Sequence, residues 1–154
     1  MLSGKPVLQH VIDAVRASGL PFHVEDVGHP GMGDSVAAAV RATPQANGWL
    51  VLPGDLPLIQ PATLLALATQ LMQADPSCQV VVPVFNGQRG HPVGFAAQCR
   101  GDLMALAGEH GAASVVKKYA VREVPVDDAG CTTDIDTVTD LEKAQRLLTA
   151  RSTQ

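Results

Sequence analysis

An aspartate that directly follows a buried strand is the residue of this sequence best placed to carry chemistry. Asp55 stands in the segment Leu52-Pro53-Gly54-Asp55-Leu56-Pro57, after the apolar run Trp49 to Leu52. Open α/β sheets bind ligands beyond the carboxyl ends of their strands, and a carboxylate there can hold Mg²⁺ together with substrate phosphates. The segment predicts either a metal ligand at Asp55 or a structural role, in which the aspartate caps the helix that begins near Pro61 or shapes the turn between the two prolines.

A second group of carboxylates lies in the segment Thr133-Asp134-Ile135-Asp136-Thr137. Alternate residues of an extended segment share a face, so Asp134 and Asp136 are expected on one side and Ile135 on the other. Asp136 also precedes a helix, whose N-terminus favours negative charge. Helix capping is therefore the default role of Asp136, and a shared metal site requires that Asp136 and Asp55 meet in space.

Two glycine-containing segments are further candidates. The segment Gly31-Met32-Gly33-Asp34-Ser35 is expected to form a loop that runs into a helix, where backbone N–H groups could bind phosphate or ribose; an ordinary turn accounts for it equally well. His91, in the segment Gly90-His91-Pro92-Val93-Gly94-Phe95, stands at the start of a strand, where a histidine is more often structural than catalytic. The other four histidines share no metal-ligand spacing with His91.

Alternating helices and strands must position these residues. Hydrophobic periodicity predicts helices near 6–19, 35–42, 61–72, 102–107, 112–119 and 138–148, an extended stretch over 22–27, and strands over 49–52, 80–82, 92–96 and 121–126. This order predicts the α/β class, with a three-layer αβα Rossmann-like domain and a mostly parallel sheet over residues 1–149, followed by a frayed tail over 150–154. Doubly wound domains usually open with a strand and an anion-binding loop, whereas this chain enters a helix at once. Either the sheet lacks its usual first strand or the sequence begins too late to include it; in both cases we expect the first strand to be missing.

Composition and charge exclude several classes of protein. The 154 residues are 46% hydrophobic and 17% charged, which is typical of a globular domain and not of a disordered chain. A net charge of −4 gives no electrostatic basis for binding nucleic acid, and no apolar run is long enough to span a membrane. The three cysteines form no CxxC motif, so they support neither a disulfide framework nor a thiolate metal site. We therefore expect a cytoplasmic protein.

Four segments taken together resemble a known family. GMGDSVAAAV, LPGDLPLIQPATL, GHPVGF and TDIDTVTDL, in this order and at these intervals, resemble the nucleotidyltransferases related to molybdenum-cofactor cytidylyl- and guanylyltransferases. The resemblance covers the chain from about Gly4 to Leu148, and four ordered motifs are far more specific than any one of them. It implies transfer of an NMP, most readily CMP, from an NTP to a phosphorylated acceptor such as molybdopterin, with release of pyrophosphate.

The resemblance also implies roles for individual residues. The aspartate matching Asp55 is catalytic in that family and binds magnesium with the nucleotide, and the one matching Asp136 is a candidate second ligand. The implied cofactor is Mg²⁺; the implied partners are CTP or GTP and a phosphorylated small molecule, and a molybdoenzyme is a further candidate. The residues implied at the nucleotide are Gly31, Met32, Gly33, Ser35, Pro53 and Gly54, and those implied on the acceptor side are Gly90 and His91.

The N-terminus departs from the family pattern. The family opens with a strand and a glycine-rich, arginine-containing loop followed by a lysine, which together hold the triphosphate; nothing in residues 1–6 matches it. That loop would supply most of the positive charge that phosphoryl transfer needs. The alternative is therefore a non-catalytic nucleotide-binding or regulatory remnant of the same fold, so the sequence leaves open whether the chain is an active enzyme. A receiver domain with Asp55 as phosphoacceptor is disfavoured, because the acidic residues and the late lysine that it needs are missing.

Overall fold

Each helix and strand that the sequence predicts has a counterpart in the structure, which adds the short strand Gln88–Arg89 and two short 3₁₀ helices, labelled η. The computed structural model describes residues 1–73 and 77–153. None of the described helices is long and apolar enough to cross a membrane. In chain order the elements are α1 (Val7–Ser18), α2 (Met32–Ala42), β1 (Gly48–Val51), α3 (Pro61–Met72), β2 (Val80–Phe85), β3 (Gln88–Arg89), β4 (Val93–Ala96), η1 (Ala97–Cys99), α4 (Arg100–Met104), α5 (Ala113–Lys118), β5 (Val121–Pro125), η2 (Ala129–Cys131) and α6 (Val138–Ser152).

The sheet has the order β1-β4-β2-β3 in the described part of the chain, with β5 beside β2. Strands β1, β2 and β5 run in the same direction, whereas β4 is antiparallel to both of its neighbours, β1 and β2. The chain reverses at Asn86 and Gly87, whose φ angles of 50° and 75° make a two-residue hairpin turn between β2 and β3. The sheet is thus mixed: β4 and β3 interrupt a set of parallel strands.

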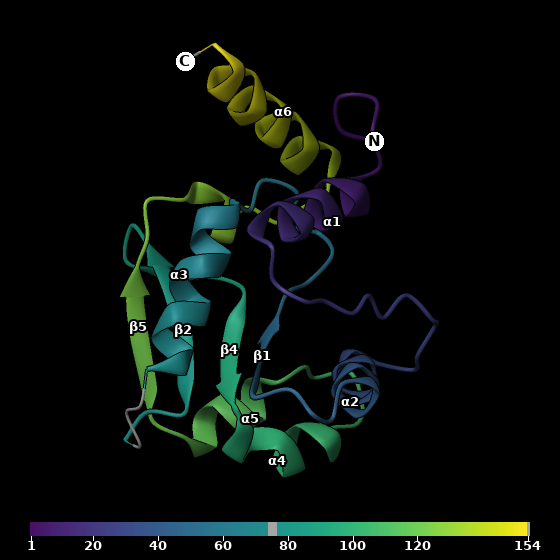
Figure 1. Cartoon of the computed structure of the whole chain (residues 1–154). Coiled ribbons are helices and arrows are strands. Elements are labelled where there is room, and N and C mark those ends of the chain that lie inside the picture. The colour runs from purple at the N-terminus through teal and green to yellow at the C-terminus, as the bar shows by residue number, and fades with distance from the viewer. Residues whose placement is uncertain (74–76, 154) are drawn as a thin grey trace.

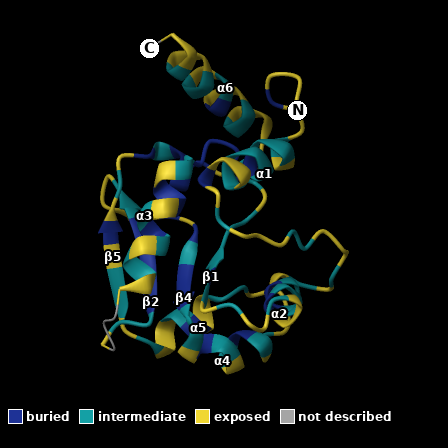
Figure 2. Ribbon diagram, viewed as in Figure 1, coloured by how far each residue is buried: buried dark blue, intermediate teal, exposed yellow. Residues whose placement is uncertain are grey.

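Helices pack on both faces of the sheet and give three layers; Figure 1 shows α3 lying across one face. On one face α3 packs across the strands, with Leu67 against Val81. On the other face α2, α4 and α5 contribute Val40, Leu103 and Val115 to the main core cluster. Figure 2 shows buried residues along β2 and β4, whereas α3, which lies across them, carries exposed residues on its outer face. The αβα architecture predicted from the sequence is confirmed.

Strand β1 lies at one edge of this sheet. Within the described residues it pairs only with β4. The described residues ahead of α1 contribute an isolated bridge between Leu2 and Lys5, and not the opening strand that doubly wound domains usually have. The loop that follows β1 and carries Asp55 therefore leaves the sheet from a strand with one described neighbour.

Helices α1 and α6 lie at the end of the sheet where both chain termini are found (Figure 1). Helix α6 begins with the predicted capping residues: the Thr137 side chain accepts a hydrogen bond from the Asp140 amide, and the Asp140 carboxylate accepts one from the Thr137 amide. The helix continues through Ser152, so the expected frayed tail over 150–154 is wrong for residues 150–152. Gln154 lies outside the described residues.

The short helix η2 rests directly on the backbone that precedes α3. Gly130 is buried there, and a Cβ atom at this position would lie 2.1 Å from the Leu58 carbonyl oxygen and 2.8 Å from the Asp128 carboxylate. Such distances are well inside van der Waals contact, so only glycine allows η2 to approach this closely. The approach fixes the chain immediately before Asp134 and Asp136.

Substitution of Gly130 by alanine is therefore expected to destabilise the fold. The added methyl group has no room, and overpacking of this kind costs about 1–3 kcal/mol in the free energy of unfolding. Gly101→Ala is the matched control, because Gly101 is exposed in α4 and a Cβ there meets nothing within 4 Å; it should be neutral or slightly stabilising. Urea unfolding followed by circular dichroism measures both, and equal effects would contradict the packing described for η2.

Candidate functional site

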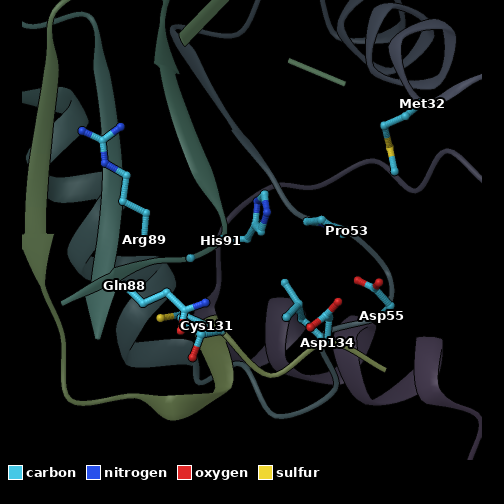
Figure 3. Close-up of a pocket in the computed structure, with 11 residues that line it drawn as sticks. Met32, Pro53, Asp55, Gln88, Arg89, His91, Cys131 and Asp134 are labelled. Carbon is cyan, nitrogen blue, oxygen red and sulfur yellow. The ribbon is translucent and has the colours of Figure 1, made fainter. Parts of the chain in front are cut away.

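A pocket of about 280 Å³ opens where several loops meet at the end of the sheet. Its walls come from segments far apart in the sequence: the start of α2, the loop after β1, the β3–β4 connection and the segment after η2 (Figure 3). Parallel strand ends gather loops in this way, which is why α/β sheets bind ligands there. Of the residues predicted at a site, those that line the pocket are Met32, Pro53, Asp55, Gly90 and His91.

Three carboxylates converge beside this pocket. Asp55, Asp134 and Asp136 each offer an oxygen, and these oxygens all lie within 4.8 Å of one another. The Ile135 amide donates a 2.9 Å hydrogen bond to the Asp55 carbonyl oxygen, which ties the two acidic segments together while Asp134 and Asp136 take the same side. In Figure 3 the carboxylates of Asp55 and Asp134 point toward one another. The condition set by the sequence, that Asp55 and Asp136 meet in space, is satisfied.

The proximity of these groups to one another shifts their pKa values. Burial raises the pKa of Asp55, and the charge of Asp134 adds to this shift while the nearby His91 opposes it. A hydrogen bond to Asp134, followed by the repulsion from its charge, raises the pKa of Asp136. Three like charges with oxygen donors at this spacing suit a hard divalent cation such as Mg²⁺ or Mn²⁺, which would neutralise the repulsion.

His91 is one of the residues that line the pocket (Figure 3). Although part of the ring meets solvent, the pocket walls remove enough water to lower its pKa, against the opposing effect of Asp55 and Asp134. The imidazole is therefore neutral at neutral pH and can donate one hydrogen bond and accept another. Its amide donates a 2.9 Å hydrogen bond to the Cys131 carbonyl oxygen, so η2 fixes the position of this residue as well.

The glycine segment before α2 differs from its prediction. Helix α2 begins at Met32, so Gly33, Asp34 and Ser35 form its first turn and not a loop. The Gly33 amide donates to the Gly108 carbonyl oxygen, and the Gly108 amide donates to the Asp34 carboxylate, which anchors the helix start on a distant segment. This anchoring extends the helix beyond its predicted start at Ser35. Residues predicted at the nucleotide that do not line the pocket are Gly31, Gly33, Ser35 and Gly54.

The structure adds residues that the sequence did not single out for the site. Gln88 and Arg89 reach the pocket because the Asn86-Gly87 turn folds β3 back beside β2, and this dipeptide is a recognised hairpin signal. Cys131 also lines the pocket, but burial raises the pKa of its thiol to about 11, so it is protonated at neutral pH and is no nucleophile. Asp134, which the sequence places on the same side as Asp136 but does not assign to the metal, also belongs to the carboxylate cluster.

Comparison with known proteins agrees with this geometry. The domain described as MobA-like NTP transferase matches residues 1–124, which is more than half of the chain. The chain belongs to the MobA-like NTP transferase family. The resemblance drawn from the four sequence motifs is thereby confirmed at the level of the family. The match includes Asp55 and His91 and ends before Asp134 and Asp136.

Individual proteins similar to this chain share less than 30% of their residues with it. The bifunctional protein GlmU of Desulfitobacterium hafniense is 27% identical over 110 residues, which cover 58% of this chain and 24% of that protein, so the match spans about a quarter of the relative's length. Rv0371c of Mycobacterium tuberculosis, solved in complex with manganese, has a TM-score of 0.74 at 23% identity and covers 95% of this chain and 89% of its own. Molybdopterin-guanine dinucleotide biosynthesis protein A of Archaeoglobus fulgidus has a TM-score of 0.70 at 19% identity, and the match covers 97% of this chain and 89% of that protein. These two structures share the fold.

Asp136→Asn is expected to weaken the binding of a divalent cation at the carboxylate cluster. Loss of one negative charge beside a doubly charged ion should reduce Mn²⁺ affinity at least about tenfold. Asp26→Asn is the control, because Asp26 is exposed and outside the cluster. Titration of Mn²⁺ followed by electron paramagnetic resonance measures both affinities. Equal affinity in Asp136→Asn and the control would remove Asp136 from the metal site.

The same cluster predicts two pH effects. A proton competes with the cation at Asp55 and Asp136, whose pKa values are raised, so Mn²⁺ affinity should begin to fall at a higher pH than for ordinary aspartates, which titrate near about 4.

Without metal, a raised folded-state pKa lowers stability at neutral pH, and this loss is recovered as the pH falls through that pKa. Asp136→Asn in EDTA should therefore melt above the wild type at pH 7 and converge with it in acid; a constant difference would contradict the repulsion.

Proposed function

We propose that this chain is a nucleotidyltransferase domain that binds an NTP with a divalent cation and transfers its NMP to a phosphorylated small molecule. The observation that carries the proposal is the convergence of Asp55, Asp134 and Asp136 beside a pocket at the strand ends. Carboxylates at such a position hold Mg²⁺ through one or two oxygens and leave its other positions to phosphate. The MobA-like family supports the same class of reaction.

The reaction needs no covalent intermediate on the protein. A phosphate oxygen of the acceptor attacks the α-phosphorus of the NTP in line, the bond between the α-phosphorus and the bridging oxygen breaks, and pyrophosphate leaves with the bonding electrons. Asp55, Asp134 and Asp136 would hold the Mg²⁺, which supplies charge neutralisation at the phosphates. The protonated Cys131 thiol in the same pocket takes no part in this chemistry.

The size and lining of the pocket divide it between two substrates. Its volume of about 280 Å³ is slightly below the range of sites that enclose a whole ligand, which begins at about 300 Å³. We therefore infer that it encloses the phosphates and leaves the base outside. Pro53 and Met32 would contact the nucleotide, and Gly90 with the neutral His91 would face the acceptor. CTP is the proposed donor, with GTP second, and molybdopterin is the proposed acceptor.

Nucleotide binding without turnover is the second candidate function, and the charge of the pocket favours it. Among the described residues that line the pocket, Arg89 alone carries a permanent positive charge, and its Nε lies 3.7 Å from the Glu123 carboxylate. Phosphoryl transfer depends on preorganised positive charge around the phosphates. A regulatory or carrier role would need the cation and nucleotide to bind but would not need this additional charge.

Release of pyrophosphate from CTP or GTP, with Mg²⁺ and molybdopterin, tests which function holds. We expect release that depends on the acceptor and falls about a hundredfold or more in Asp55→Asn, because an electrostatic group at the reacting phosphates is lost. Asp26→Asn should match the wild type. Calorimetry with each Mg-NTP completes the test: binding without pyrophosphate release favours the second function, and absence of binding contradicts both.

His91→Ala should separate the acceptor from the nucleotide. The substitution removes a hydrogen bond worth about 0.5–1.5 kcal/mol, so the KM for the acceptor should rise up to about tenfold. The affinity for Mg-CTP should stay within about twofold of the wild type, because the substitution removes no contact with the nucleotide and so leaves the free energy of binding nearly unchanged. Steady-state kinetics with varied acceptor and varied CTP measure the two constants, and a rise confined to CTP would place His91 on the nucleotide side.

A further inference from the structure

Asp128 is a buried carboxylate that the proposed reaction does not use. Its side chain is 2% exposed, and both of its oxygens accept hydrogen bonds from other parts of the fold. A carboxylate buried to this degree is retained only where its charge and its acceptor oxygens are matched. The position of its partners shows what it holds together.

The two oxygens of Asp128 bind different parts of the fold. Oδ2 accepts hydrogen bonds from the Gln60 amide at 3.0 Å and the Thr63 hydroxyl at 2.6 Å, at the start of α3. Oδ1 accepts one from the Gly130 amide at 2.8 Å, within η2. The guanidinium of Arg151, from the last turn of α6, lies 3.4 Å from Oδ1 and also donates to the Leu58 carbonyl oxygen at 2.9 Å. One side chain thus joins α3, η2 and α6.

Two series of hydrogen bonds connect η2, the turn that Asp128 holds, to the candidate site. In the first, the Cys131 carbonyl oxygen accepts the hydrogen bond from the His91 amide. In the second, the Thr133 hydroxyl donates to the Ala129 carbonyl oxygen at 2.8 Å, and two residues later the Ile135 amide donates to the Asp55 carbonyl oxygen at 2.9 Å. A shift of η2 would therefore move His91 and the carboxylate cluster together.

We propose that Asp128 is the positioning residue of the site: by fixing η2 against α3 and α6, it sets the spacing of the three aspartates and the place of His91. Its effect on the cation rests on the proposed function, whereas its effect on η2 does not. Arg151 also contributes to this arrangement. Its guanidinium, on α6, compensates the buried charge of Asp128 and so links this helix to the site.

Asp128→Asn tests the proposal with little change in volume. The amide has one acceptor oxygen in place of two, and its NH₂ group would face a backbone N–H donor in either orientation, that of Gly130 or that of Gln60. Asp127→Asn is the matched control, because Asp127 is the exposed neighbour and loses the same charge. Both variants are measured well below their melting temperatures, with amide hydrogen exchange and Mn²⁺ titration.

We expect exchange protection of the His91 and Ile135 amides to fall at least about tenfold in Asp128→Asn, while the interior amides of β2 and β5 change much less. Mn²⁺ affinity should fall about ten- to hundredfold, as for other residues that hold a metal ligand in place, and Asp127→Asn should match the wild type. Equal losses at all amides would mean that Asp128 stabilises the fold as a whole, and an unchanged exchange pattern would also overturn the proposal. If the wild type binds no Mn²⁺, the proposed function fails, and the exchange pattern still decides the role of Asp128.

Arg151→Gln keeps the proposal testable if Asp128→Asn does not fold. It removes the guanidinium but leaves the hydrogen bonds from Gln60, Thr63 and Gly130 to the carboxylate, so the same amides should lose protection to a smaller extent. Arg146→Gln, an exposed arginine on the same helix, is its control. Protection of His91 and Ile135 that is equal in the two variants would exclude the link from α6 to the site.

Discussion

Repulsion among Asp55, Asp134 and Asp136 is the constraint that the rest of the site depends on. Left to themselves, three carboxylates would separate, yet their oxygens lie within 4.8 Å of one another. The fold opposes this repulsion with neutral backbone contacts, chiefly the hydrogen bond from the Ile135 amide to the Asp55 carbonyl oxygen. The raised pKa values of Asp55 and Asp136 are the direct consequence, and a divalent cation is the group that relieves it best.

The elements around the cluster owe their arrangement to close backbone packing. Gly130 lets η2 rest on the Leu58 carbonyl, and Gly90 lies so close to the Cys131 carbonyl that a Cβ there would come within 2.2 Å. The acidic segment and the histidine segment consequently share one support. Helix α6 then begins at the Thr137 capping box directly after Asp136, which stops the acidic segment from moving outward. Rigid supports of this kind allow like charges to be held at ligand distance.

Local features of the site follow from the sequence, whereas its assembly does not. The apolar run ending at Asp55, the alternation of Asp134 and Asp136, and the Thr137 cap are all short-range patterns, and the αβα class follows from their order. The meeting of Asp55 with Asp136 depends on tertiary packing between distant segments. The start of α2 was mispredicted because its anchor on Gly108 is equally remote. The hairpin between β2 and β3 could have been anticipated from Asn86-Gly87, but the buried role of Asp128 has no local signal.

Anomalous scattering from crystals grown with Mn²⁺ and a non-hydrolysable CTP analogue tests the central claim most directly. A single manganese peak should lie between the oxygens of Asp55, Asp134 and Asp136, with the phosphates of the analogue completing its coordination inside the pocket. Such a peak would establish the cation as the link between this chain and its nucleotide. A nucleotide bound elsewhere, or manganese bound without contact to these aspartates, would contradict the claim.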